Sequence, residues 1–212
     1  MLQFQNLTLI HQKDQFRLVD GLTGVVHPGD KVAIIGEEGT GKSSLLKWLC
    51  RCPEVNDYLE AQGSYQCTFQ QMGYLPQFLP SKEEPLSVYD FLFHDLDANE
   101  IDYSYLAKLA SDFQLDQDFL YSNQEMGTLS GGQKIKIQLM KILLHHPDIL
   151  LLDEPSNDLD YESIQWLEDF IRTSDLAILY ISHDVVLLKN TATSILHLEK
   201  IAHQQRAVVH FV

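Results

Sequence analysis

At residues 36–43 the chain reads Gly-Glu-Glu-Gly-Thr-Gly-Lys-Ser, and this stretch decides its fold. It matches the pattern G-x-x-x-x-G-K-[ST], which a chain of this length contains by chance on the order of one time in a hundred. An apolar run at 32–35 precedes it and a helix is expected over Ser44–Cys50 after it. Backbone N–H groups and a helix N-terminus would then point at one place, as a phosphate group requires.

We therefore interpret the stretch as a phosphate-binding loop rather than a plain glycine turn between a strand and a helix. Lys42 would bridge the β- and γ-phosphates of a nucleotide, and the Ser43 hydroxyl would bind magnesium. The predicted nucleotide-binding residues of this loop are Gly36, Glu37, Glu38, Gly39, Thr40, Gly41, Lys42, Ser43 and Ser44.

Short apolar runs alternate with helical patterns along the rest of the chain. The runs 32–35, 149–152 and 177–181 are apolar at consecutive positions, as in strands that helices cover on both faces. Apolar residues recur at helical spacing over 135–142 and 164–171. This alternation predicts an α/β domain with a mainly parallel core sheet. The phosphate-binding loop at 36–43 adds the expectation of a P-loop NTPase.

The two ends of the chain have a different pattern. Apolar and polar residues alternate at 2–5 and glycines interrupt 18–26, which predicts an antiparallel β layer. Near the C-terminus, 194–198 and 207–212 predict two more strands around a polar turn at 203–206. The chain then stops without a polar tail, so we expect a single domain over 1–212 that is a piece of a longer chain.

Residues 78–128 predict a helical subdomain within that domain. They carry 11 acidic residues against Lys82 and Lys108. Ser87 has the chemistry of an N-cap before a short apolar segment, and apolar residues over 106–113 fit one helix face.

Composition restricts the function classes. Of the 212 residues 45% are hydrophobic, enough for a sizeable core, and 30 acidic against 15 basic side chains give a net charge of -15. That charge opposes attachment to nucleic acid or anionic lipid through the surface as a whole, so we expect no direct sequence-specific nucleic-acid binding. Apolar stretches stay short of the ~20 residues of a membrane span, and the N-terminus lacks the pattern of a signal peptide. We expect a cytoplasmic chain.

Two acids end the apolar run 149–152. A buried strand that terminates in a carboxylate places it at the carboxyl edge of the sheet, where Asp153 can hold a magnesium ion. Glu154 is then free to orient and deprotonate an attacking water. A solvated acidic pair at the end of an ordinary strand is the alternative.

A third motif is Leu129-Ser130-Gly131-Gly132-Gln133. Ser130 has the chemistry of an N-cap, and the two glycines let the backbone come close to a ligand. Such a helix N-terminus predicts a second anion site, although a capped helix start needs no ligand.

Together with Gln77 after Tyr74-Leu75-Pro76, and with Ser182-His183-Asp184, these motifs resemble the nucleotide-binding domain of ABC ATPases. The resemblance spans nearly the whole chain. It implies ATP and Mg²⁺ as cofactors, ATP hydrolysis, and a head-to-tail dimer in which a partner cassette's LSGGQ segment closes the site. It also implies that Gln77 senses the γ-phosphate and magnesium, and that His183 contacts the γ-phosphate.

Residues 154–160 and 163–168 look like the corresponding stretch of the ABC-F branch, "EPTNHLD...SIEWLE". This resemblance implies the first cassette of a twin-cassette ATPase that acts on the ribosome. The alternative is the ATPase subunit of a membrane transporter, whose partners are transmembrane subunits.

Some positions depart from the family pattern. Glu37 and Glu38 place two negative charges beside the triphosphate, and Asp184-Val185 follows His183 where "SHDR" is usual. The aromatic residue that stacks on adenine is not evident, with His11 and Phe16 as the candidates.

Overall fold

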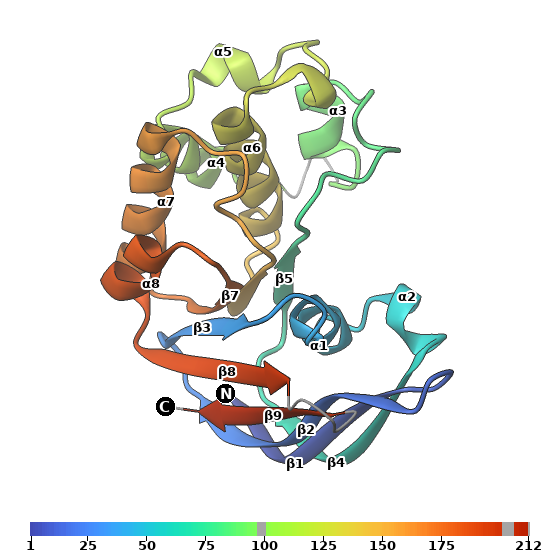
Figure 1. Cartoon of the computed structure of the whole chain (residues 1–212). Coiled ribbons are helices and arrows are strands. Elements are labelled where there is room, and N and C mark those ends of the chain that lie inside the picture. Colours follow the sequence, from blue (N-terminus) through green and yellow to red (C-terminus); the bar gives the residue numbers. More distant parts are fainter. Residues whose placement is uncertain (97–100, 201–205, 212) are drawn as a thin grey trace.

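The computed structural model describes residues 1–96, 101–200 and 206–211. These residues form one sheet with the strand order β4-β1-β2-β9-β8-β3-β7-β6-β5 (Figure 1). The strands, in chain order, are β1 Leu2–His11, β2 Phe16–Val26, β3 Lys31–Gly36, β4 Leu59–Cys67, β5 Met72–Leu75, β6 Ile149–Leu152, β7 Ala177–Ile181, β8 Ser194–Lys200 and β9 Arg206–Phe211.

One half of the sheet is parallel. β8, β3, β7, β6 and β5 are parallel neighbours in that order. Every residue of β6 and β7 is buried, because helices lie on one face of these strands and the α1 helix lies on the other. The predicted parallel core sheet and its three apolar strands are therefore confirmed.

The other half of the sheet is mainly antiparallel. β1 pairs with both β2 and β4 in this sense, as the alternation at the N-terminus predicts. β9 joins the two halves, since it runs antiparallel to β8 and parallel to β2. The antiparallel layer is thus continuous with the core sheet in the described part of the chain. Residues 203–205 of the predicted C-terminal turn lie outside the described residues.

Helix α1, Lys42–Leu49, lies between the two halves of the sheet (Figure 1). Its apolar residues Leu45, Leu46 and Leu49 are buried in a core cluster shared with β1, β2, β3, β6 and β7. The short helix α2, Pro53–Asn56, follows it. Because α1 starts directly after the phosphate-binding loop, this burial fixes the position of the loop against the sheet.

The remaining helices gather on the opposite face of the parallel strands, in the upper part of Figure 1. They are α3 Val88–Phe93, α4 Tyr103–Asp112, α5 Gln117–Leu120, α6 Gly131–Leu143, α7 Tyr161–Thr173 and α8 Val185–Thr191, with the 3-10 turn Met126–Thr128 before α6. One apolar cluster joins residues of α3, α4, α6, α7 and α8 with β5, β6 and β7. Ser87 caps α3 by accepting a hydrogen bond from the Asp90 N–H, as predicted.

Candidate functional site

Side chains from four strand ends meet at the carboxyl edge of the parallel sheet. The phosphate-binding loop follows β3, and Gln77, Glu154 and His183 each stand two residues beyond their strands, β5, β6 and β7. Because these strands are parallel neighbours, their carboxyl ends place the side chains around one cavity of about 700 Å³. The loop contributes Glu38, Gly39, Gly41, Lys42, Ser43 and Ser44 to the lining, and the other lining residues are His11, Leu18, Tyr58, Gln77, Glu154 and His183.

The loop holds its own shape through contacts among its residues. Lys42 is only 6% exposed, and its Nζ donates to the carbonyl oxygens of Gly36 and Glu37 at 2.8 Å each. Burial lowers the pKa of Lys42, against the opposing effect of Glu154, Asp153 and Glu38. The buried Thr40 hydroxyl donates to the same Glu37 carbonyl at 2.8 Å. The Lys42 side chain therefore packs against the backbone of its own loop and forms part of the cavity wall.

Three of the predicted loop residues do not line the cavity: Gly36, Glu37 and Thr40. They shape the loop instead. A Cβ on Gly36 would lie 2.2 Å from the Leu198 carbonyl oxygen, so only glycine fits against β8. Gly41, with φ 89°, starts α1 where a Cβ would lie 2.7 Å from Leu18 Cβ. These glycines allow close backbone packing as well as the loop's turn.

The structure brings together Ser43 and Asp153, two of the three predicted magnesium residues; the third is Gln77. The Ser43 hydroxyl donates to Asp153 Oδ1 at 2.9 Å, and the Tyr74 hydroxyl donates to Oδ2 at 3.1 Å. Asp153 is 2% exposed, and burial raises its pKa while the two hydrogen bonds lower it. A hydroxyl and a carboxylate side by side are oxygen ligands that Mg²⁺ prefers, so these residues fit the ion. The amide of Gln77 instead bonds to Glu154.

Glu154 is held by two amide groups. Gln77 Nε2 donates to its Oε2 at 2.9 Å, and Asn157 Nδ2 donates to the same oxygen at 2.6 Å. The other oxygen, Oε1, lies 3.6 Å from His183 Nε2. The Glu154 backbone is left-handed, with φ 49°. Sequence reasoning selected Gln77, Glu154 and His183 but missed Asn157, whose only signal was its place three residues after Glu154.

The LSGGQ segment lies away from this cavity. Ser130 caps α6 in a capping box: Gln133 N–H donates to Ser130 Oγ at 3.2 Å, and Ser130 N–H donates to Gln133 Oε1 at 3.1 Å. Ser130, Gly132 and Gln133 line a separate hollow beside α5. Residues 129–133 do not line the nucleotide cavity, although Gly131 lines a further hollow whose wall includes Gln77 and Glu154.

The two glycines of this segment also pack closely within the chain. A Cβ on Gly131 would lie 2.4 Å from the Asp158 carbonyl oxygen, and one on Gly132 would lie 2.0 Å from Ser163 Oγ. The close approach seen within this chain is to its own loop at 155–160 and to α7.

An aromatic pair lines the cavity next to the loop. The rings of His11 and Tyr58 lie 5.6 Å apart between centroids. Tyr58 reaches this place because β1 pairs with β4 in a register that sets His11 opposite Leu59. Sequence reasoning named His11 but missed Tyr58, for which no local signal exists. Phe16, the other candidate, does not line the cavity.

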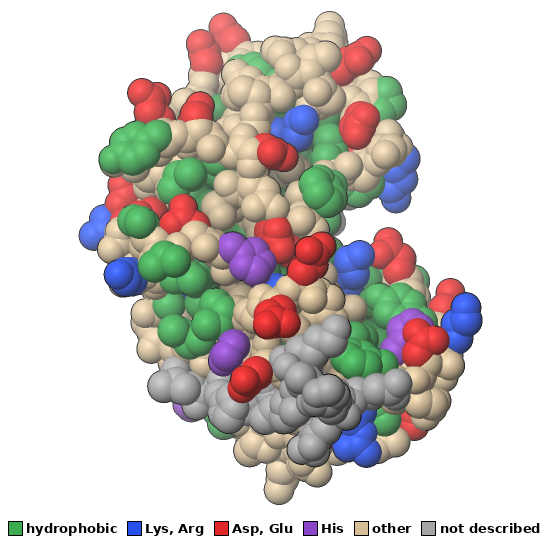
Figure 2. All heavy atoms as spheres, viewed as in Figure 1, with side chains coloured by type: hydrophobic (Ala, Val, Ile, Leu, Met, Phe, Trp, Pro, Cys, Tyr) green, Lys and Arg blue, Asp and Glu red, His purple; other side chains and the backbone are tan. Residues whose placement is uncertain are grey.

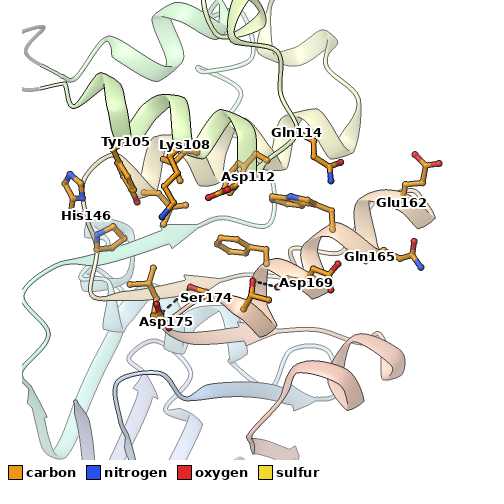
Figure 3. Close-up of a pocket in the computed structure, with 18 residues that line it drawn as sticks. Tyr105, Lys108, Asp112, Gln114, His146, Glu162, Gln165, Asp169, Ser174 and Asp175 are labelled. Carbon is orange, nitrogen blue, oxygen red and sulfur yellow. Dashed lines mark hydrogen bonds between the residues drawn. The ribbon is translucent and has the colours of Figure 1, made fainter.

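A larger cavity, of about 970 Å³, lies elsewhere (Figure 3). Tyr105, Lys108 and Asp112 from α4 face Asp169 of α7 across it (Figure 3). Its lining also includes aromatic side chains, those of Phe113, Trp166 and Phe170. It is near Pro147 and Asp175, which precede β6 and β7, so it lies at the amino edge of the strands. Its rim carries Asp112, Glu162, Asp169 and Asp175 against Lys108, and this charge disfavours a triphosphate.

Because the protein surface is largely acidic, phosphate binding depends strongly on the positive charge of Lys42. Figure 2 shows acidic side chains over both the upper and the lower parts of one face, with Lys and Arg side chains scattered singly among them. In a chain of net charge -15, a phosphate group depends on local donors, and Lys42 supplies the cation at the cavity.

Residues 19–157 match the model of a protein family described as "ABC transporter". This chain belongs to the ABC ATPase family. Among the described residues, no helix of this ABC cassette is both long and apolar enough to cross a membrane.

Curated relatives of the cassette include members of the ABC-F branch. It is 33% identical to the ATP-binding protein Uup of Buchnera aphidicola subsp. Acyrthosiphon pisum over 203 residues, covering 94% of this chain and 31% of that protein. It is 30% identical to the energy-dependent translational throttle protein EttA of Mycobacterium tuberculosis H37Rv over 216 residues, covering 86% and 38%. The cassette thus spans about a third of the length of these relatives.

Solved structures share its fold. The ATP binding subunit of an ABC transporter matches with a TM-score of 0.76 at 22% identity, covering 100% of this chain and 89% of that one. The archaeal ribosome recycling factor aABCE1, solved in complex with the ribosomal stalk protein aP1, matches with a TM-score of 0.73 at 23% identity, covering 98% and 38%. The ABC cassette architecture expected from the sequence is thereby confirmed.

Proposed function

We propose that the cassette binds ATP with magnesium in the 700 Å³ cavity and hydrolyses it to ADP and phosphate. One observation carries this proposal: residues suited to three different tasks lie together at the carboxyl edge of the parallel strands. Lys42 supplies the phosphate-binding cation, Ser43 and Asp153 supply metal ligands, and Glu154 supplies a proton acceptor.

In this proposal the triphosphate lies along the loop, with its charge balanced by Lys42 and by the backbone N–H groups at the start of α1. Ser43 and Asp153 would hold Mg²⁺, which neutralises phosphate charge when bound. The rings of His11 and Tyr58 line the part of the cavity where the nucleobase would lie.

Glu154 acts as the general base. The water oxygen forms a bond to the γ-phosphorus, the bond from that phosphorus to the bridging oxygen of ADP breaks, and a proton of the water passes to the Glu154 carboxylate. Gln77 and His183 flank this carboxylate and would contact the γ-phosphate and the water.

A second cassette completes the site. In this proposal the LSGGQ segment serves the partner's nucleotide in a head-to-tail dimer, which is supported by the separation of the hollow beside Ser130 and Gly132 from the nucleotide cavity. The partner is a second cassette of the same longer chain or a second copy of this one, and closing of the dimer does mechanical work.

We further propose that this work is done on the ribosome, in the cytoplasm. The names of two similar proteins support this direction, namely the translational throttle protein EttA and the ribosome recycling factor aABCE1. The rival reading is service to the transmembrane subunits of a transporter, because the ATP binding subunit of an ABC transporter shares this fold.

The substitution Glu154→Gln tests the proposal. It keeps the size of the side chain and its two hydrogen-bonding neighbours but removes the proton acceptor. ATP should bind with nearly unchanged affinity, while single-turnover hydrolysis falls by roughly 10² or more. Calorimetry and single-turnover kinetics measure the two parts. Undiminished hydrolysis would mean that another group is the base.

A further inference from the structure

The two oxygens of the Glu154 carboxylate have different surroundings. Oε2 accepts two hydrogen bonds, from Gln77 Nε2 and from Asn157 Nδ2. Oε1 lies toward His183, at 3.6 Å from Nε2, beyond the length of a good hydrogen bond. Two donors on one oxygen orient the whole carboxylate, so Oε1 is the atom with acceptor positions left for a water.

Asn157 holds Glu154 through its main chain as well as its side chain. Residues 154–157 form a turn in which the Asn157 N–H donates to the Glu154 carbonyl oxygen at 3.2 Å. Pro155 occupies the second position of this turn, which its fixed φ favours. Both ends of Glu154 are therefore tied to one residue, in a backbone conformation that a glutamate otherwise adopts rarely.

We propose that Asn157 is a positioning residue for hydrolysis. By donating to Oε2, it fixes the carboxylate so that Oε1 is the oxygen that receives the water proton. This inference rests on the proposed role of Glu154 as the base. Gln77 shares the same oxygen, but Gln77 follows β5 on a separate strand, whereas Asn157 moves with Glu154 because both belong to one turn.

Two substitutions separate hydrogen bonding from shape. Asn157→Ala removes the donor, and kcat should fall roughly tenfold while KM and the dissociation constant of ATP stay unchanged. Asn157→Asp keeps the shape but replaces the donor with an acceptor of the same charge as Glu154, so kcat should fall at least as far. A role in loop shape alone predicts that Asn157→Asp retains the rate of the unaltered chain.

The matched control is Asn190→Ala. Asn190 also donates its side-chain amide to a glutamate, Glu168 Oε1, at 2.7 Å, and it is similarly exposed but lies on α8 away from the cavity. Its loss should leave kcat unchanged. Asn157→Ser is the second test variant, for the case in which Asn157→Ala lowers the ATP affinity or the melting temperature more than Asn190→Ala does. Asn157→Ser restores a small polar side chain. The inference then requires that Asn157→Ser lose as much kcat as Asn157→Ala while its ATP affinity stays normal.

A double-mutant cycle completes the test. In the Glu154→Gln background, Asn157→Ala should cause no further loss in single-turnover rate, because the oxygen that it orients no longer accepts a proton. An equal loss in both backgrounds, or a kcat of Asn157→Ala within twofold of the unaltered chain, would overturn the inference. If Glu154→Gln alone keeps the full single-turnover rate, Glu154 is not the base. If only Asn157→Ala keeps the full rate, Glu154 is still the base, but Asn157 does not position it.

Discussion

At the scale of single residues, the two glutamates of the phosphate-binding loop differ. The Glu38 side chain lines the cavity, and its charge acts on Lys42, whereas Glu37 uses its backbone carbonyl to accept hydrogen bonds from Lys42 and Thr40 and does not line the cavity. From the sequence we expected both charges to lie beside the triphosphate. In the structure only Glu38 lines the cavity, where its charge would repel a bound triphosphate.

This difference gives a prediction with an internal control. Glu38→Asn should tighten ATP binding roughly threefold to tenfold, since it removes a like charge that solvent screens only in part. Glu37→Gln should leave the dissociation constant unchanged. Calorimetric titrations of both variants at low and moderate salt would show the gain for Glu38→Asn shrink as salt rises. Equal effects at the two positions would contradict the assignment.

At the scale of elements, the start of α6 is fitted closely to its neighbours. A Cβ on Gly131 would meet a backbone oxygen, that of Asp158, while one on Gly132 would meet the side chain of Ser163. A backbone atom moves only with its loop, but a serine hydroxyl can rotate.

Alanine substitutions should therefore differ at these positions. Gly131→Ala should destabilise the fold by about 1–3 kcal/mol, and Gly132→Ala by less, as measured by denaturant unfolding. Ser163→Ala should restore part of the stability of Gly132→Ala and none of that of Gly131→Ala. Equal losses without rescue would show that packing against α7 is not the reason for the glycine at 132.

The elements also show what local pattern predicts. The apolar runs of β3, β6 and β7 and the caps Ser87 and Ser130 follow from neighbouring residues, and the sequence predicted them. The placement of Gln77, Glu154 and His183 at one edge follows from parallel strands. Contacts that depend on distant register or on an unusual backbone angle could not be predicted.

Tyr58 and Asn157 are such cases. Tyr58 lies against His11 only because of the pairing between β1 and β4, which no local pattern fixes. Asn157 reaches Glu154 only because Glu154 is left-handed and the turn at 154–157 closes. Likewise, the need for glycine at 131 and 132 depends on where the loop at 155–160 and α7 pack.

At the scale of the whole molecule, the nucleotide cavity and the LSGGQ surface are separate. On the proposed head-to-tail dimer, one chain would present half of each of two composite sites. Hydrolysis would then depend on association, since binding would require only the loop but turnover would require the partner's Ser130 and the backbone that follows it.

The most direct test is the ATP hydrolysis rate per chain as a function of chain concentration, with the assembly state followed by sedimentation. We predict slow hydrolysis in dilute samples, a rate per chain that rises as dimers form, and no such rise for Ser130→Arg, which should still bind ATP. A fixed rate per chain, maintained down to dilutions at which the protein is demonstrably monomeric, would contradict the composite site.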